Sequence, residues 1–261
     1  MKSIHIFAAL FMGSLLFSSC EKQVFSTGNE SDFIEVPEKN SSLIYHFSST
    51  TSANSGSVGY DQFTDYLDLY DSAHVLVTLT EGNVGNANND TIFAANSAAY
   101  GVLSTSTFLT NFGSGVATQI SMQEGAPVVV NAAYELELTP TKIIVNTTTE
   151  FFKDNVGDEF FLTPYIVVDS LVADQTGHPD GPATNHRKVV TEVARLKNYP
   201  VRYLGYSIAS GEVYAGQRFN LKFEAERSSD WIDPEQISVA LILTKKDASG
   251  NITYVNANTN H

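Results

Sequence analysis

The chain has almost no cysteine: Cys20 is its single cysteine in 261 residues. Exported proteins commonly use disulfides for stability, and one thiol cannot form a disulfide within the chain. Stability must therefore come from a hydrophobic core. The part that follows the N-terminal region is long enough, and rich enough in Val, Ile, Leu, Phe and Tyr, to supply one or two such cores.

Positive charge is also scarce. Lys and Arg together number 15 against 29 Asp and Glu, so the formal net charge is −14. An acidic surface repels phosphate backbones and anionic lipid headgroups, so nucleic acid is not expected as a partner. After Cys20 there is no second long apolar segment, so one soluble body is expected there.

The position of Cys20 indicates a bacterial lipoprotein signal. Lys2 precedes an apolar run from Ile4 to Phe17, and small residues stand directly before the cysteine. This layout predicts a signal peptide over residues 1–19 and a diacylglycerol on the Cys20 thiol. The run is shorter than the about 18–20 residues of a spanning helix, which leaves an ordinary secretory signal as the main alternative. Two or three acyl chains hold a protein stably on a bilayer, so the protein is expected to act at a membrane surface.

Residues 20–42 are polar, acidic and poor in large apolar side chains, which predicts a flexible tether. The segment 43–125 then mixes two kinds of pattern. Apolar runs at 43–47 and 74–80 predict buried strands, and apolar residues at helical spacing over 63–70 predict a helix between them. A further helix is expected near 93–103 and a third strand at 107–112. This order predicts a βαβ unit with parallel strands.

Residues 126–261 carry strand patterns alone. Alternating or apolar runs are separated by turn residues such as Ser249, Gly250 and Asn251. Regularly spaced strands of this kind predict an antiparallel, immunoglobulin-like β-sandwich. The expected fold class is therefore α+β. The expected strands are 128–138, 142–152, 160–172, 188–194, 217–226, 237–244 and 252–255.

The order of lipoprotein signal, acidic tether, small αβ unit and β-sandwich resembles the Omp-twenty-eight-related outer membrane lipoproteins of Gram-negative bacteria. More specific likeness lies in the strand and loop at 43–59, in 164–175, in Asn185 and His186 before the strand at 188, and in the closing segment with Trp231 and 254–257. The resemblance implies a thioredoxin-like N-terminal half, over 43–125, and an outer membrane location.

A redox-active thioredoxin-like domain carries Cys-x-x-Cys after its first strand, where a helix N-terminus lowers the pKa of the first thiol. The matching stretch here runs from Ser52 to Ser55 and has no cysteine. Serine forms no disulfide, so thiol–disulfide exchange is excluded at this site. Two interpretations stay open: a degenerate redox site kept as a binding surface, or only a flexible Ser/Gly loop over 48–59.

The most polar constellation lies between residues 169 and 186, with Asp169, Asp174, Asp180 and His186 close in sequence. Oxygen-rich loops between sandwich strands can hold Ca²⁺, but the Asp-x-Asp-x-Asp spacing of a strong site is missing. Glycines and prolines in the loop favour a surface excursion instead. The segment is therefore predicted as a binding loop without a metal.

Exposed aromatic rings could stack on sugars, and Tyr203, Tyr206 and Trp231 lie in loop-rich stretches. Packing of these rings in the sandwich core is the favoured interpretation, and glycan stacking is the alternative. Hydrolase signatures such as Gly-x-Ser-x-Gly and His-Glu-x-x-His do not occur, and His46 and His74 are interpreted as structural.

These observations predict a non-catalytic, lipid-anchored outer membrane protein without a cofactor. Its expected partners are the membrane, through the acyl chains on Cys20, and other envelope proteins that it binds or helps to assemble. The alternative hypothesis is a surface glycan-binding lipoprotein.

Overall fold

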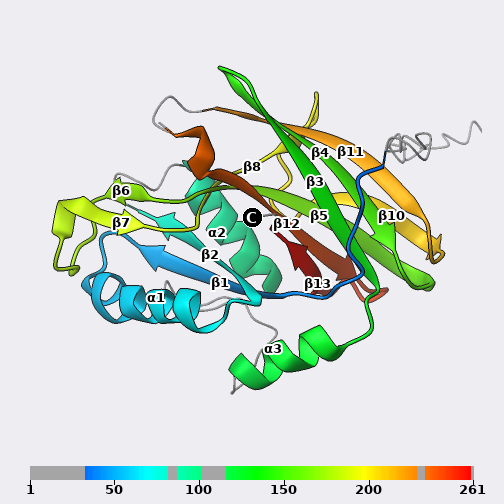
Figure 1. Cartoon of the computed structure of the whole chain (residues 1–261), viewed down its shortest axis with the longest axis horizontal. Helices are drawn as coiled ribbons and strands as arrows, with labels where there is room; N and C mark the ends of the chain where they lie inside the picture. Colours follow the sequence, from blue (N-terminus) through cyan, green and yellow to red (C-terminus); the bar gives the residue numbers. More distant parts are fainter. Residues whose placement is uncertain (1–32, 82–86, 101–115, 228–232, 260–261) are drawn as a thin grey trace, which may run out of the picture.

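The computed structural model describes residues 33–81, 87–100, 116–227 and 233–259, and its strands form two main sheets and one small hairpin (Figure 1). The larger sheet contains β1 (Ser42–Ser49), β2 (Ala73–Thr80), β5 (Asn155–Val168), β8 (Val189–Val193), β10 (Tyr206–Val213), β12 (Ile237–Lys246) and β13 (Ile252–Asn258). The smaller sheet contains β3 (Val130–Leu138), β4 (Lys142–Phe151), β9 (Arg195–Leu196) and β11 (Arg218–Glu226). The hairpin pairs β6 (Leu171–Ala173) with β7 (Thr184–His186).

Helices are fewer than strands in this part of the chain. The α-helices are α1 (Tyr60–Leu69), α2 (Ala87–Tyr100) and α3 (Val116–Gly125). Shorter helical turns are a π-helical turn at Ser55–Gly59 and 3₁₀ turns at Gly181–Ala183 and Pro234–Gln236. Within the described residues, no helix has the length and apolar character that crossing a membrane requires.

The two sheets face each other and bury the main core between them. Strands β3, β4 and β11 of the smaller sheet pack against β5, β10 and β12 of the larger one. Val145 and Phe223 on one side, and Leu162 and Leu241 on the other, are fully buried. Apolar residues that alternate along these strands face inward, as a sandwich requires. The prediction of an α+β fold with a β-sandwich is confirmed.

The parallel pair β1–β2 explains why both strands read as continuous apolar runs. Ser42 lies opposite Ala73 and the register continues to Ser49 opposite Thr80. Helix α1 covers one face of the pair, where Phe63 packs against Ile44 and Val77. Helix α2 covers the other face. Both faces are thus buried, and the predicted parallel strand–helix–strand unit is confirmed for β1, α1 and β2.

The larger sheet runs across the expected domain boundary at residues 125 and 126. Its strand order is β1-β2-β8-β5-β12-β13, and β10 pairs with β5. β2 and β8 come from the two expected domains and pair in parallel, with Val77 opposite Val189. The third expected strand of the first half, 107–112, lies outside the described residues, as do the expected signal peptide and Cys20.

Residues 33–41 correct the expected tether, because they are packed against the body of the protein. Buried Asn131 donates from Nδ2 to the carbonyl oxygens of Pro37 and Lys39, at 2.9 and 3.1 Å. Buried Asn256 donates to the Lys39 carbonyl at 2.9 Å and accepts from the Ser41 amide at 2.9 Å. A polar segment gains a fixed place here because side chains from β3 and β13 bond its backbone. We call residues 33–41 the N-terminal strap.

Strand β10 is not among the strands that the sequence predicts, because the stretch around Tyr203 and Tyr206 has the composition of a loop. Its pairing with β5 is interrupted twice, between Ser207 and Ala209 and between Ser210 and Glu212. Each irregularity shifts which side chains face the core. The alternation that predicts a strand is therefore lost in the sequence.

Candidate functional site

The loop after β6 is latched onto the segment that follows β1. Gln175 is 1% exposed, and its Nε2 lies 3.1 Å from the carbonyl oxygen of Ser49 and 3.4 Å from that of Ser52. The amide of Thr176 donates to the carbonyl oxygen of Thr50 over 2.8 Å. These bonds join segments more than 120 residues apart in the sequence. We call residues 174–183 the latched loop.

Two glycines allow this close approach. A Cβ on Gly56 would lie 2.0 Å from the carbonyl oxygen of Thr176, and a Cβ on Gly177 would lie 2.4 Å from that of Ala53. Gly177 also has a φ of +86°, a conformation that side chains disfavour. The two backbones touch where any larger residue would separate them.

The latched loop lies over the expected degenerate redox motif. Ser52 is half-buried, and its carbonyl oxygen accepts a hydrogen bond from Gln175. Ser55 is 2% exposed. Ser55 therefore presents little surface to a partner. The structure brings together two regions that the sequence had singled out separately, the stretch from Ser52 to Ser55 and the loop that includes Asp174 and Asp180.

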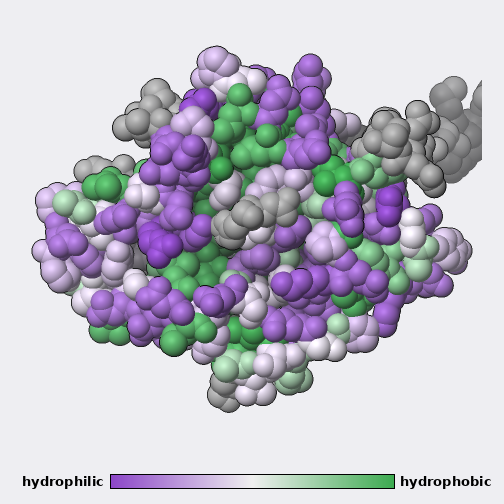
Figure 2. Space-filling model, in the orientation of Figure 1, coloured by the Kyte–Doolittle hydropathy of each residue, from purple (hydrophilic) through white to green (hydrophobic). Residues whose placement is uncertain are grey.

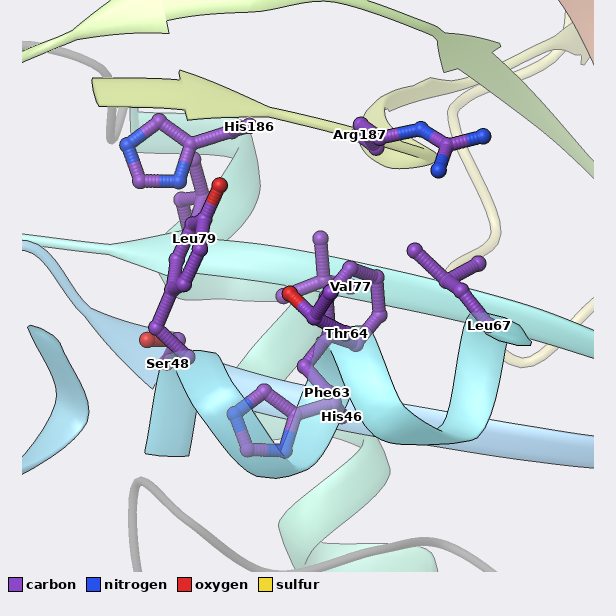
Figure 3. Close-up of a pocket in the computed structure, with 10 residues that line it drawn as sticks. His46, Ser48, Phe63, Thr64, Leu67, Val77, Leu79, His186 and Arg187 are labelled. Atoms are coloured by element: carbon purple, nitrogen blue, oxygen red, sulfur yellow. The ribbon is translucent and has the colours of Figure 1, made fainter. Parts of the chain in front are cut away.

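A small hollow lies beside this latch, between α1 and the strands β1, β2 and β7 (Figure 3). It contains about 340 Å³ of empty space, part of it open to solvent. His46 and His186 come from different strands, β1 and β7, and Arg187 points away from His186. Phe63 and Leu67 of α1 give it apolar walls. Figure 2 shows apolar side chains at the surface between α1 and the β6–β7 hairpin, with hydrophilic ones on either side.

Both histidines are neutral at pH 7. Burial lowers the pKa of His46 to about 4. Burial, together with the nearby His178, lowers the pKa of His186 to about 4. The Nε2 atom of His186 is buried and has no hydrogen-bond partner among the described residues. A histidine with so low a pKa is a poor proton acceptor at neutral pH, because an efficient general base titrates near the working pH.

Tyr60 links the hollow to the hairpin. Its hydroxyl donates to the carbonyl oxygen of Asn185 over 2.8 Å, and its ring centroid lies 4.2 Å from that of His178. Burial, with the negative charge of Asp180, raises the pKa of Tyr60. No local sequence pattern indicates this role for Tyr60, because its partners lie more than 100 residues away along the chain.

The acidic residues of the predicted binding loop take different places. Asp174 and Asp180 are exposed, and an oxygen of Asp180 lies 3.8 Å from Nδ1 of His178. Asp169 lies at the end of β5, with an oxygen 3.2 Å from Nζ of Lys188. Burial raises the pKa of Asp169, but the charge and hydrogen bonds of Lys188 outweigh it, so the net pKa is lowered.

These side chains do not converge on one point. His186 is buried in the hollow, whereas Asp174 and Asp180 face solvent. Within the described ranges, no group of three His, Cys, Asp or Glu residues is arranged to hold a metal ion.

The aromatic residues considered for glycan stacking differ in how far they are buried. Tyr206 is fully buried in the sandwich core, and its hydroxyl donates to the carbonyl oxygen of Pro200 over 3.0 Å. This burial agrees with core packing, and Tyr206 offers no exposed ring to a sugar, so the possible stacking role is corrected for this residue. Tyr203 is half-buried and packs beside Tyr254 and Tyr165. Trp231 lies outside the described residues.

Comparisons with known proteins bear on the fold alone. No protein-family model matches the chain, and no curated protein matches it. The structure is similar to HBP35 of Porphyromonas gingivalis, with a TM-score of 0.64 and 12% sequence identity over 87% of this chain and 76% of that one. A β-glucosidase from Kluyveromyces marxianus aligns with 51% of this chain and 14% of its own, at a TM-score of 0.19 and 12% identity. The likeness to HBP35 is close enough to describe a shared fold, whereas the alignment with the β-glucosidase is not.

Proposed function

We propose that this protein is a non-catalytic, lipid-anchored outer membrane protein that binds other envelope proteins. The latched loop is the observation that carries this proposal. Polar loops on a rigid scaffold are common binding surfaces, and a loop that is already ordered loses less entropy when it binds. Gln175 and Gly177 hold this loop in place, while Asp174, Pro179 and Asp180 remain exposed on it.

The strap and the latched loop lie at opposite ends of the molecule (Figure 1). The amide of Ile34 donates to Oγ1 of Thr148 over 2.9 Å, which places the start of the strap on the smaller sheet. The β6–β7 hairpin lies at the other end of the longest axis. The described chain thus begins at the end opposite the latched loop.

The proposal includes a thioredoxin-like first half without redox chemistry. A parallel β1–β2 pair with α1 on one face and α2 on the other supports that interpretation, as does the helical turn that starts at Ser55. The immunoglobulin-like character of the sandwich is proposed in the same way, because the antiparallel smaller sheet faces the antiparallel strands β5, β10 and β12 of the larger, mixed sheet.

The low pKa values of the two histidines support a role without catalysis. The hollow that contains His46 and His186 is small, and neither ring is suited to general base catalysis near pH 7. Arg187, the permanent charge at this hollow, points away from His186 (Figure 3). The exposed loop therefore offers a better functional surface than the hollow.

The test is chemical crosslinking of the full-length protein in native membranes, followed by purification and mass spectrometry. The wild type is compared with Cys20→Ser, which cannot be acylated, and with the charge reversals Asp174→Lys and Asp180→Lys. We expect the same few envelope proteins with the wild type and a marked loss with the loop variants. The surface variant Glu137→Lys, far from the loop on β3, is the matched control and should keep the partners. No reproducible partner for the wild type would contradict the proposal.

A further inference from the structure

A pocket lies on the face of the larger sheet that is turned away from the sandwich core. Leu241 and Leu243 of β12 belong to that core, so their neighbours Ile242 and Thr244 are directed to the opposite face. Ile242 lies opposite Thr163 of β5 in the sheet, and Thr163, Ile242 and Thr244 all line the pocket. The pocket contains about 420 Å³ of empty space, part of it open to solvent.

Four tyrosine rings form much of the wall of this pocket. They come from four parts of the chain: Tyr45 on β1, Tyr165 on β5, Tyr203 in the segment before β10, and Tyr254 on β13. Tyr45 and Tyr165 are buried, whereas Tyr203 and Tyr254 are half-buried and lie toward the solvent. The pocket therefore offers aromatic surface to a ligand, and aromatic rings pack on one another favourably.

Hydrogen bonds hold these rings in place. The hydroxyl of Tyr254 donates to the carbonyl oxygen of Ser41 over 2.6 Å. The hydroxyl of Tyr165 donates to the carbonyl oxygen of Tyr203 over 3.3 Å and accepts from Nδ2 of Asn96 on α2 over 3.2 Å. A site whose side chains are already fixed loses less entropy when a ligand binds.

Thr244 brings an unsatisfied hydroxyl to the pocket. The residue is 2% exposed, and its Oγ1 has no hydrogen-bond partner in the part of the chain that the structure describes. It lies opposite Tyr254 in the β12–β13 pair, so the hydroxyl stands next to an aromatic wall. A buried hydroxyl without a partner costs free energy, and a ligand that supplies the partner removes that cost.

The pocket favours an uncharged ligand. Its described lining residues include no Asp, Glu, Lys or Arg. Burial raises the pKa of Tyr165 to about 12 and also raises the pKa of Tyr45 and of Tyr254, so these hydroxyls are neutral at pH 7. A charge that enters such a site loses its hydration and gains no counter-ion.

The same lining argues against a sugar. Apart from the tyrosines, its described polar side chains are Asn96, Thr163 and Thr244, and the amide N–H group of Asn96 is already engaged by Ile92 and Tyr165. A sugar carries several hydroxyls that would each need a partner here. The empty space is near the lower end of the range for ligand pockets, about 300–1,000 Å³, so a small compound is favoured.

We propose that this pocket binds a neutral compound with one aromatic ring and one hydroxyl group, that is, a simple phenol. The ring packs between the tyrosine rings, and the hydroxyl forms a hydrogen bond with Oγ1 of Thr244. This small-molecule site goes beyond the proposed binding of envelope proteins and does not depend on it.

The test is isothermal titration calorimetry of the full-length protein with p-cresol and with toluene, which differ only in the hydroxyl. The wild type should bind p-cresol about fivefold more tightly, as expected for one neutral hydrogen bond. Thr244→Val keeps the shape of the side chain and should abolish this preference. Tyr203→Leu removes a ring and should weaken the binding of both compounds by about threefold or more.

Thr149→Val is the matched control. Thr149 is also buried on β4 with an unpartnered Oγ1 in the described structure, but it does not line this pocket. This variant should keep the preference for p-cresol. Urea denaturation should show that both valine variants stay folded, because neither replacement breaks a described hydrogen bond.

Three results would overturn the inference. One is the absence of saturable p-cresol binding by the wild type. Another is an unchanged preference for p-cresol in Thr244→Val, which would place the hydroxyl of the ligand elsewhere. The third is an equal loss of preference in Thr244→Val and Thr149→Val, which would show a general effect of the substitutions.

Discussion

Acid should destabilise this protein through His46, whose pKa is lowered from 6.5 to about 4 by burial. Between these two values the unfolded chain binds a proton at this position and the folded chain does not. Stability is therefore greatest above pH 6.5 and is lost as the pH falls toward 4. His186, with the same low pKa, acts in the same direction.

The size of the effect follows from the pKa difference. Each pH unit below 6.5 costs about 1.4 kcal/mol for a group that stays neutral in the folded state. At pH 5 the cost at His46 is therefore about 2 kcal/mol. A side chain that is 1% exposed is little screened by solvent, so this value needs little reduction.

Glu192 opposes the histidines. Burial raises the pKa of Glu192 to about 7, although the charge of Arg195 acts against this. The folded state then binds a proton that the unfolded state has released between about pH 4.5 and 7, and stability falls as the pH rises through this range. The histidines and Glu192 change the free energy of unfolding with pH in opposite directions. The contribution of His46 must therefore be measured by comparing the wild type with a variant at that residue.

The assay is urea denaturation of the wild type and His46→Leu at pH 7 and pH 5. The wild type should lose about 2 kcal/mol more than the variant over this interval, because leucine keeps the volume and cannot be protonated. An equal loss in both proteins would refute the reasoning. NMR titration of the His46 ring in the wild type gives an independent value, and a pKa near 6.5 would refute it as well.

Three further predictions concern other parts of the fold. Asn256→Ala should lower the free energy of unfolding by about 3–4 kcal/mol in urea denaturation, because three buried backbone groups and one partly buried one lose a partner at about 1 kcal/mol each; Asn258→Ala, which removes one partly buried bond, should cost about 1 kcal/mol. Gly177→Ala should open the latched loop to limited proteolysis, whereas Gly250→Ala, which shares the positive φ but meets no neighbour, should not, and equal cleavage would contradict the latch. Glu192→Gln should raise stability by about 1–2 kcal/mol at pH 8, after allowance for solvent screening, with no gain at pH 5; a gain at both pH values would point to another cause.

Local sequence patterns predicted the strands and helices whose buried residues follow a regular period. The strands β1 and β2 are covered on both faces by helices, so their apolar runs are continuous and visible in the sequence. The spacing of Phe63, Tyr66 and Leu67 predicted α1, because only one face of this helix packs on the sheet and its apolar residues recur at helical spacing. In β10, the bulges and Gly211 remove the alternation, and no local signal remains.

Long-range contacts were the part that sequence reasoning could not provide. The strap is predicted as a tether because residues 20–42 as a whole are polar and acidic, although Phe33, Ile34 and Val36 within it are apolar and Val36 is buried. The asparagines that hold it lie on β3 and β13. The latch depends on Gln175, whose partners Ser49 and Ser52 lie more than 120 residues earlier in the chain. Sequence patterns did identify both sides of this contact as polar loops. They gave no sign that one loop would cover the other.

The strap has a mechanical consequence for a protein held by its N-terminus. Its backbone is bonded to Asn131 on β3 and to Asn256 on β13, strands from the two different sheets. A pull on the chain before Phe33 would thus load several hydrogen bonds across both sheets before it reached β1. The core strands β1 and β2 would therefore be shielded from such a force, and under the proposed anchoring the N-terminal end would bear tension while the far end keeps its shape.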